Sequence, residues 1–464
     1  MRDQINIASA RLHMMKKVLL SLLSQKRIAG GAAVLAITQL ISSGCGFLRD
    51  QAFSIVFPLD KDPIGIASVY IAAFRPSDLL FQIFVMSCLS VVLVPFLASH
   101  LAHDRREEMN RITSSTMVVF GIVFGLIALL MAILFPILAP HMVKFQGASL
   151  ALYVRFGRIA LLTNFLFVFG NTLGQYLITV QRYWIYGITP ILWALGTIGG
   201  TYLLSPVIGS MGPIIGTLLG TVIYLIVRLI GAKNAGFKFS SLSEDLLHPE
   251  LRQMGFLILP RMAALGALQL QLLLLDRLAS GLAPGMVALN QFASNFESVI
   301  PGIVGISIAQ SAFSILSQSA AKGNIAAMKK NIVHGVLFNL ALSIPGAVAL
   351  ALLTQTAAWV LHLGAAVVPL FTHSLWIYCI AVPFESTNHI VLRSFYATKN
   401  TLWPAISSAV SCMVAVVAGT ILLPELGVFA LAIAYVVAQV GQTLFLGSSL
   451  SVILYRKTAA TSSR

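Results

Sequence analysis

Long apolar segments fill most of this 464-residue chain and restrict its fold more than any other feature. Hydrophobic residues make up 58% of the chain and charged residues 10%, whereas a soluble domain carries about 25% charged residues. A helix needs about 20 apolar residues to cross the hydrocarbon core of a bilayer. Twelve stretches predict an all-α polytopic membrane protein: 29–57, 66–98, 116–140, 149–180, 186–205, 209–231, 252–280, 286–317, 331–356, 365–396, 401–423 and 427–455.

The distribution of basic residues tests this count, because Lys and Arg collect in cytoplasmic loops. With the N-terminus inside, 21 of the 30 Lys and Arg residues, Arg228 among them, fall in segments predicted to be cytoplasmic. The predicted outer loops hold Lys61 and Lys144, and the other seven are arginines within or beside apolar segments. This asymmetry predicts twelve spans with both termini in the cytoplasm. The net charge of +15 therefore does not indicate nucleic-acid binding.

Five regions follow from this topology. They are a basic N-terminal tail (1–28), a six-helix N-lobe (29–232), a cytoplasmic interlobe loop (233–251), a six-helix C-lobe (252–455) and a C-terminal tail (456–464). An offset of about 218 residues aligns the Pro206–Gly209 segment with Pro424–Gly427. Six plus six helices of the same orientation indicate a parallel repeat, which in transporters places the substrate between the halves.

Seven arginines lie at membrane depth, where an arginine costs at least about 2.5 kcal/mol and normally faces protein or water. They are Arg49, Arg75, Arg155, Arg158, Arg261, Arg277 and Arg393, against five acids at that depth, Asp50, Asp78, Asp276, Glu297 and Glu385. This excess of positive charge predicts an interior site for an anionic substrate. We interpret Arg155, Arg158 and Arg393 first as structural or snorkelling residues.

The remaining polar residues concentrate on the first, second, seventh and eighth predicted helices, which we expect to line a central cavity. Pro76 weakens the second helix beside Arg75, and Asp78 shares a helix face with that arginine. We expect the acids to hold the arginines when no substrate is bound. The predicted substrate-binding residues are Arg49, Asp50, Arg75, Asp78, Arg261, Asp276, Arg277, Asn295 and Glu297.

Other motifs indicate packing and not chemistry. Two glycine pairs, Gly121/Gly125 and Gly216/Gly220, have the spacing typical of helix contacts. The sequence contains no phosphate-binding glycine loop, HExxH motif or serine-nucleophile elbow. We therefore expect no enzyme activity, catalytic residue, metal or cofactor; coupling to the membrane potential, Na⁺ or H⁺ stays open. The cysteines lie far apart in apolar stretches, which indicates buried thiols: Cys45, Cys88, Cys379 and Cys412.

Five stretches resemble the MurJ/MviN family of lipid II flippases, within the multidrug/oligosaccharidyl-lipid/polysaccharide flippase superfamily. They are Gly46–Asp50, Ala72–Leu80, Leu89–Pro95, Leu275–Leu282 and Ala288–Asn290. The resemblance implies two six-helix lobes that rock between inward and outward openings in the bacterial cytoplasmic membrane. It also implies an undecaprenyl-pyrophosphate-linked peptidoglycan precursor as substrate, with its pyrophosphate held by cavity arginines. We expect a monomer whose partners are this lipid-linked oligosaccharide, membrane lipids and cell-wall synthesis proteins.

The chain departs from the family pattern where the resemblance places charged residues, at Ser68, Phe81, Gln82 and Phe296. These departures leave open a flippase for another polyprenyl-linked glycan, of the O-antigen or capsule type. A cation-coupled drug exporter is less favoured, because cationic drugs need cavity acids that are not paired with arginine. A non-transporting scaffold of envelope assembly is the alternative from a different class, and it predicts no effect of cavity-arginine substitutions.

Overall fold

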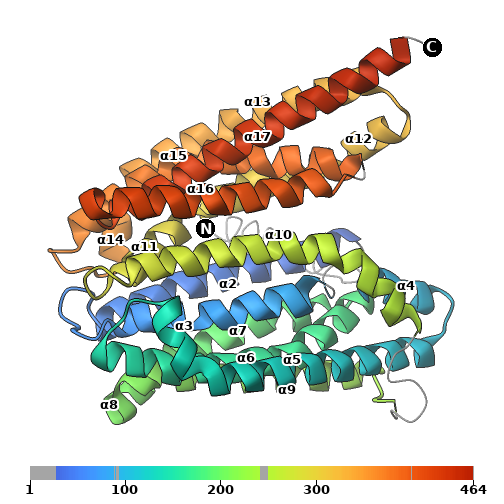
Figure 1. Cartoon of the computed structure of the whole chain (residues 1–464). Helices are drawn as coiled ribbons and strands as arrows, with labels where there is room; N and C mark the ends of the chain where they lie inside the picture. The colour runs from blue at the N-terminus through green and yellow to red at the C-terminus, as the bar shows by residue number, and fades with distance from the viewer. Residues whose placement is uncertain (1–27, 88, 90–92, 241–248, 399, 463–464) are drawn as a thin grey trace, which may run out of the picture. The chain divides into compact units, whose positions relative to one another are not determined.

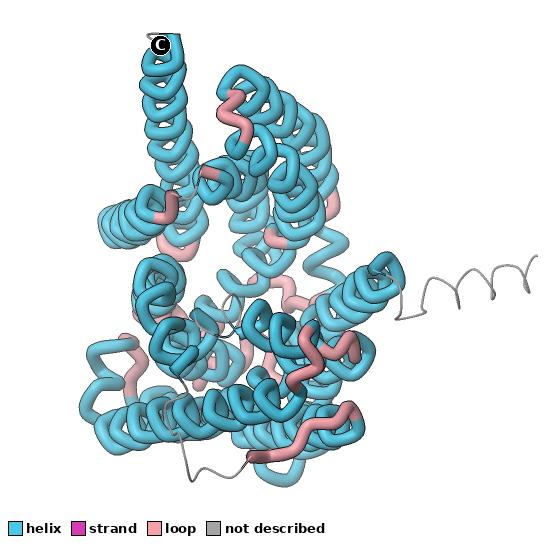
Figure 2. The backbone as a smooth tube through the Cα atoms, turned by 90° about the vertical axis from the view of Figure 1, so that its right-hand side faces the viewer, coloured by secondary structure: helices cyan, strands magenta, loops and turns pink. Residues whose placement is uncertain are grey.

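The structure, a computed structural model, describes residues 28–87, 89, 93–240, 249–398 and 400–462 (Figure 1). Within these ranges the chain consists of helices joined by short loops and contains no strand (Figure 2). The predicted N-terminal tail and residues 241–248 of the predicted interlobe loop lie outside the described residues. The all-helical fold class predicted from the sequence is confirmed.

The helices form two successive groups. The first comprises α2 (Ile28–Val56), α3 (Ile66–Phe81), α4 (Val94–Ala102), α5 (Arg106–Met142), α6 (Gly147–Thr179), α7 (Tyr183–Gly199), α8 (Ser205–Ile208) and α9 (Gly212–Asn234). The second comprises α10 (Pro249–Ala279), α11 (Met286–Glu297), α12 (Ile306–Ala321), α13 (Ile325–Leu352), α14 (Thr354–Val360), α15 (Val368–Ala397), α16 (Leu402–Leu426) and α17 (Phe429–Ser462). Short π or 3₁₀ turns lie between some of them, namely η1 (Gln82–Met86), η3 (Gly200–Leu204), η4 (Gly209–Met211) and η5 (Pro301–Gly305).

Nine helical segments in the described part of the chain are long and apolar enough to cross a membrane. One of these segments, Tyr183–Asn234, contains both α7 and α9, which the sequence analysis separates into two spans. Neither α2 nor α15 is among the nine. The helical membrane architecture is therefore established, and the number twelve stays a prediction.

Backbone features recur at nearly the offset predicted for the repeat. Helices α3 and α11 each begin after a glycine with positive φ, Gly65 at 67° and Gly285 at 91°. Each helix is followed by a π turn, η1 in the first half and η5 in the second. Gly209 and Gly427 also match, with φ 59° and ψ −135° against φ 54° and ψ −130°. These correspondences support a six-plus-six repeat.

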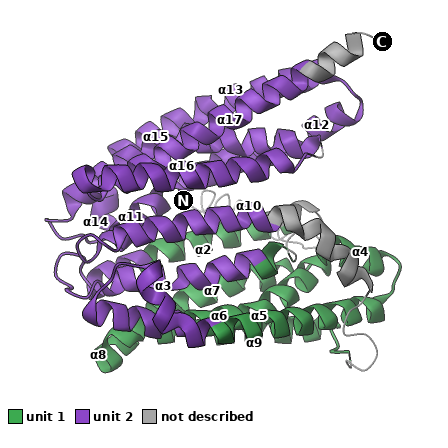
Figure 3. Cartoon of the chain, in the orientation of Figure 1, with its two compact units in different colours: residues 1–49, 84–130, 159–256 green, residues 50–83, 131–158, 257–464 purple. Residues whose placement is uncertain are grey.

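Two compact units divide the chain (Figure 3). Unit 1 consists of residues 1–49, 84–130 and 159–256, and unit 2 of residues 50–83, 131–158 and 257–464. Unit 2 thus includes α3 and the connection between α5 and α6, although both belong to the first half of the sequence. This division groups residues by contact and not by repeat, so the predicted lobe boundaries stay a prediction.

Small residues let α7 and α9 approach closely in unit 1. A Cβ atom at Gly200 would lie 2.5 Å from Gly216 Cα, and one at Gly220 would lie 3.0 Å from Gly196 Cα. The other predicted glycine pair, on α5, faces two phenylalanine rings of α6. Both pairs therefore pack helices together, as predicted from their spacing.

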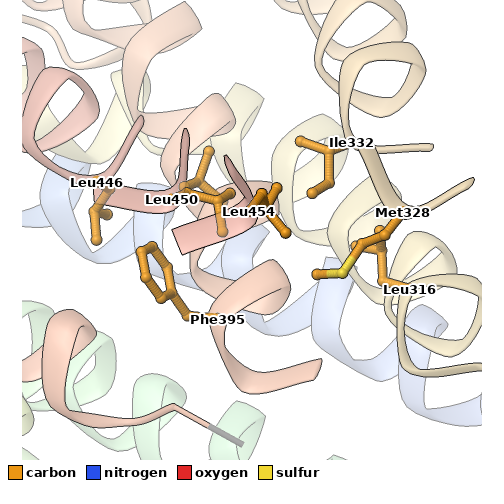
Figure 4. Packing of buried hydrophobic residues seen from close by; sticks show 8 residues of the cluster. Leu316, Met328, Ile332, Phe395, Leu446, Leu450 and Leu454 are labelled. Carbon is orange, nitrogen blue, oxygen red and sulfur yellow. The ribbon is translucent and has the colours of Figure 1, made fainter. Parts of the chain in front are cut away.

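Unit 2 contains a buried apolar cluster between α12, α13, α15 and α17 (Figure 4). Phe395 of α15 lies against leucines spaced four residues apart on α17, which places those leucines on one face of the helix. The cluster consists of Leu316, Met328, Ile332, Val391, Phe395, Leu446, Leu450 and Leu454.

Arg228 is one of the predicted cytoplasmic charges, and its side chain does not face solvent. The structure buries it in unit 1, where only 1% of the residue is exposed. Its Nε donates to Thr189 Oγ1 at 2.9 Å, its Nη1 donates to the Gly170 carbonyl at 2.8 Å, and its guanidinium lies 4.1 Å from the Tyr224 ring centre. Arg228 therefore holds three helices together, which explains how its charge is accommodated inside the protein.

Candidate functional site

A chain of polar side chains, called here the Arg75 network, lies within unit 2 and joins α3, α10, α11 and the last residues of α2. Arg75 Nε on α3 lies 2.7 Å from Asp276 Oδ2 on α10, and its Nη2 donates to Gln291 Oε1 on α11. Gln291 Nε2 donates to Asn295 Oδ1 at 2.7 Å, and Asn295 Nδ2 donates to Asp50 Oδ2 on α2 at 2.6 Å. Arg75 thus ties a helix of the first half of the sequence to two helices of the second half.

Local sequence explains how these helices present the network. Asp62 fixes the start of α3, because its carboxylate accepts the backbone N–H of Ile66 at 2.6 Å. Gln291 and Asn295 are four residues apart, so both lie on one face of α11. The network therefore depends on the start of α3 and on one polar stripe of α11.

The Arg75–Asp276 pair is buried, so its charges interact strongly. The two side chains are 13% and 4% exposed, respectively, and Asp50 at the far end of the network is 1% exposed. Water screens such a pair poorly, and removing one partner leaves an uncompensated charge inside the protein. The sequence predicts Asp78, one turn along α3, as a partner for Arg75. In the structure the acid that pairs with Arg75 is Asp276.

The beginnings of α3 and α11 meet beside this network. A Cβ atom at Gly65 would lie 3.0 Å from Gly285 N, and one at Gly285 would lie 2.7 Å from the Leu59 carbonyl oxygen. Ser68 Oγ accepts a hydrogen bond from Ala288 N at 3.0 Å. Ser68 stands where the family resemblance places an aspartate, and its hydroxyl here joins the two helices. We call this contact the α3–α11 joint.

A cavity of about 310 Å³ lies next to the joint, within unit 2. Its charged lining residue is Lys144, whose backbone N–H donates to Ser280 Oγ at 2.8 Å. Ser149 Oγ donates to the Ile64 carbonyl oxygen at 2.8 Å across the same region. The α5–α6 connection is therefore bonded both to the start of α3 and to the end of α10.

The structure brings together four of the nine predicted site residues, Asp50, Arg75, Asp276 and Asn295. Their role in substrate binding stays a prediction. Arg49 lies half-buried in α2 and belongs to unit 1, and Asp78 lies half-buried on α3. Arg261 lies in α10, and its side chain is outside the described residues. Arg277 is half-buried on α10, and its Nε has no hydrogen-bond partner among the residues that the structure describes.

Glu297 contradicts the expectation that every interior acid holds an arginine. Its side chain is fully buried, and neither carboxylate oxygen receives a hydrogen bond within the described part of the chain. It lies against the Glu385 carboxylate of α15 instead. The reason is helical geometry, because each residue turns the helix by about 100°. Asn295 faces Asp50, so Glu297, two residues later, points to the opposite side of α11.

Sequence reasoning missed several polar partners. Gln291 completes the Arg75 network, and its spacing of four from Asn295 on one helix was an available signal. Tyr378 of α15 donates to Asn290 Oδ1 at 2.8 Å in the interior of unit 2. No local pattern identifies that pair, because its members are 88 residues apart in the sequence.

The described residues contain no group of three or more His, Cys, Asp or Glu side chains that could hold a metal ion. Three of the four cysteines, Cys45, Cys379 and Cys412, are buried free thiols, as the apolar context predicted. Cys88 lies outside the described residues.

A family model described as lipid II flippase MurJ matches residues 65–461, which is most of the chain. The chain belongs to the MurJ family of lipid II flippases. MurJ proteins are transporters and not an enzyme family. Membership in the MurJ family makes this chain a multi-pass protein of the bacterial inner membrane, and it confirms the resemblance noted in the sequence.

Relatives from distant bacteria carry the MurJ name at low identity. The probable lipid II flippase MurJ of Bdellovibrio bacteriovorus is 24% identical over 428 residues, which cover 89% of this chain and 80% of the relative. The protein with the same description from Treponema pallidum is 21% identical over 438 residues, which cover 91% and 82% of the two chains.

Solved structures show the same fold. A lipid II flippase MurJ in an inward closed conformation matches with a TM-score of 0.74 at 19% identity, covering 90% of this chain and 87% of that one. An inward-facing multidrug resistance transporter of the MATE family also gives 0.74, at 13% identity and with coverage of 92% and 99%. The MurJ fold and the MATE fold are thus alike in architecture, and the structural likeness alone does not distinguish their substrates.

Proposed function

We propose that this chain moves lipid II, the undecaprenyl-pyrophosphate-linked peptidoglycan precursor, across the cytoplasmic membrane by alternating access. The observation that carries the proposal is the buried Arg75 network in a chain of the MurJ family. Twelve spans in two six-helix lobes, cytoplasmic termini and a monomeric state belong to the same proposal. The movement requires no covalent chemistry, so we propose no catalytic residue, metal or cofactor.

The chemistry of the substrate fits the arginines of the site. A guanidinium offers a planar set of donors that can bind two phosphate oxygens at once. In the structure, the donors of Arg75 are directed at Asp276 and Gln291. The Nε of Arg277 is buried without a partner among the described residues, on the residue that follows Asp276. We propose that the pyrophosphate competes with Asp276 for Arg75 and also recruits Arg277.

This competition supplies a mechanism for gating. While Arg75 holds Asp276 and Gln291, α3 stays attached to α10 and α11 at the ends that the topology prediction places outside. A ligand shifts a conformational equilibrium only by its difference in affinity for the two states. A pyrophosphate that binds Arg75 only after Asp276 has released it stabilises the state in which α3 and α10 have separated. Opening toward the outside would follow.

Transport of lipid II into the opposite leaflet of proteoliposomes tests the proposal. Arg75→Ala removes at least one hydrogen bond to a charged group, worth about 1.5–3 kcal/mol, so we expect a loss of flipping of about 10–100-fold. Arg49→Ala is expected to act in the same direction. Arg155→Ala is the matched control, because Arg155 is an exposed arginine of α6 in unit 2. Full activity of Arg75→Ala in folded protein would remove Arg75 from the mechanism.

A second candidate is a flippase for another polyprenyl-linked glycan, and the loss of one charge favours it. Phe296 stands where the family resemblance places an arginine. Its ring packs edge-on against Phe371, with the ring centres 6.0 Å apart. Native mass spectrometry can distinguish the two candidate substrates. The purified protein is offered three competing ligands: lipid II, a polyprenyl-pyrophosphate glycan without peptide, and an anionic phospholipid. Preference for lipid II that is lost in Arg75→Ala supports the first candidate. Stronger binding of the peptide-free glycan supports the second, and equal binding of phospholipid supports the scaffold alternative.

A further inference from the structure

Two acidic side chains that the Arg75 network does not use lie together in unit 2. Glu297 at the end of α11 is 0% exposed, and neither of its oxygens has a hydrogen-bond donor in the described ranges. Its acidic neighbour is the Glu385 carboxylate, on a half-buried residue in the middle of α15. Tyr435 of α17 donates its hydroxyl to Glu385 Oε2 at 2.5 Å. Residues of three helices therefore make up this carboxylate pair and its hydrogen bond.

Two negative charges side by side are strongly disfavoured in such a place. Burial of an unpaired carboxylate costs several kcal/mol, and a second carboxylate in contact adds repulsion to that cost. A proton held between the two groups removes one charge and converts the repulsion into a hydrogen bond. Two carboxyl groups that share one proton are the known outcome of this geometry in proteins. The Tyr435 hydroxyl then stabilises the single charge that remains.

Among the residues that the structure describes, no arginine donates a hydrogen bond to the pair. His389 and Arg393 follow Glu385 by one and two turns of α15, and the Arg393 guanidinium lies 5.5 Å from the Phe313 ring centre. The titratable and charged groups that face the pair are Tyr378, Cys379, His389, Arg393 and Tyr435, with Asp276 and Arg75 further away. Within the described ranges, the pair therefore receives its hydrogen bond from a tyrosine and not from a cation.

A proton fits this pair better than a metal ion does. Hard divalent cations take about six oxygen ligands, and the described residues contain no group of three or more acidic, His or Cys side chains placed to hold a metal. The Tyr435 oxygen is also oriented as a donor toward Glu385. Two neighbouring carboxylates beside one hydroxyl donor form the arrangement expected for a shared proton.

We propose that Glu297 and Glu385 form a proton-binding site that holds one proton between their carboxyl groups. On release the proton passes to water and the pair carries two negative charges, and on uptake one of these charges is neutralised. Helix α11 carries both Glu297 and the Gln291–Asn295 stripe of the Arg75 network. A movement of α11 that breaks the network therefore also changes the distance between Glu297 and Glu385. The existence of the site is independent of the substrate, whereas its coupling to flipping rests on the proposed function.

Infrared difference spectroscopy of the purified full-length protein tests the site without any lipid substrate. We expect a carbonyl band of a protonated carboxyl group at neutral pH that shifts in D₂O and is absent from the double variant Glu297→Gln/Glu385→Gln. Glu425→Gln is the matched control, because Glu425 is an exposed acid of α16, and it should leave the band unchanged. Absence of the band from the wild type, or its persistence in the double variant, would overturn the proposal.

Two further measurements keep the test decisive. Tyr435→Phe retains both acids and should shift the band, because it removes the hydrogen bond to Glu385; an unshifted band would count against the pair. Thermal unfolding in NaCl and in choline chloride of equal ionic strength detects sodium. Stabilisation by sodium that disappears in Glu297→Gln/Glu385→Gln would replace the proton by Na⁺ and overturn the assignment. A band that behaves as expected in a protein that does not flip lipid II would leave the proton site standing and refute the proposed transport.

Discussion

Ser68 and Ala288 are bonded to each other across the two halves of the sequence, with Ala288 N–H donating to Ser68 Oγ at 3.0 Å. The two positions are 220 residues apart, and so are Gly65 and Gly285, which also approach each other closely. Residues related by a two-fold repeat contact each other only where the axis passes between them. The α3–α11 joint therefore marks the axis of the predicted repeat.

The joint makes Gly285 sensitive to substitution. Its φ of 91° disfavours any side chain, and an added Cβ would lie 2.7 Å from the Leu59 carbonyl oxygen. We expect Gly285→Ala to lower the free energy of unfolding by about 1–3 kcal/mol, measured as a lower thermal midpoint in detergent. Gly323→Ala is the control, because Gly323 has φ 65° and nothing within 4 Å of its added Cβ. Equal losses in the two variants would show that the contact with Leu59 adds nothing to the backbone strain.

The Arg75–Asp276 pair should behave as a coupled unit. Removing either partner leaves a buried charge, so we expect Arg75→Met and Asp276→Leu each to destabilise the protein by about 3–5 kcal/mol. The double variant should lose much less than the sum of the single losses, because no unpaired charge remains. Chemical or thermal unfolding of the four proteins gives the coupling energy. Additive losses would mean that the 2.7 Å contact contributes little in the membrane.

Gly199, the last residue of α7, and Gly200, the first residue of η3, are adjacent but differ in the space around them. A Cβ at Gly200 would meet Gly216 Cα at 2.5 Å, whereas one at Gly199 meets nothing within 4 Å. We expect Gly200→Ala to destabilise unit 1 by about 1–3 kcal/mol, since overpacking forces the helices apart. Gly199→Ala should be neutral or slightly stabilising. Thermal midpoints of the two variants provide the measurement, and equal midpoints would contradict the close packing of α7 on α9.

The stability cost of substituting Gly174 should depend on whether Arg228 is present. A Cβ at Gly174 would lie 2.4 Å from Arg228 Nη1, so the glycine provides room for the guanidinium. We expect Gly174→Ala to cost about 1–3 kcal/mol in the wild type and much less in an Arg228→Met background. Arg228→Met alone should cost about 1–3 kcal/mol, because buried acceptors lose their donor. Arg182→Met, at an exposed arginine, serves as the control in the same unfolding assay. An unchanged cost of Gly174→Ala in both backgrounds would refute the steric link.

Much of the site could be predicted because its signal is local. An arginine beside Pro76 in an apolar helix, and an aspartate near the end of another, are conspicuous wherever charge is expensive. Asp50, Arg75, Asp276 and Asn295 were therefore identified before their contacts were known. Glu297 was identified as an interior acid, but its partner was predicted incorrectly, because the direction of a side chain depends on the rotation of its helix within the fold.

The sequence by itself determined that this chain is a helical membrane protein of the MurJ family. Segment length, apolar composition and the satisfaction of backbone hydrogen bonds within each helix act over short distances along the chain. The tertiary structure alone decided which charges meet. Arg75 pairs with an acid 201 residues away, and Glu297 has Glu385 as its acidic neighbour. Arg228 enters the interior where Gly174 leaves space, and the Gly170 carbonyl accepts its hydrogen bond. These pairings depend on how helices pack and rotate against one another, and no local pattern in the sequence records that arrangement.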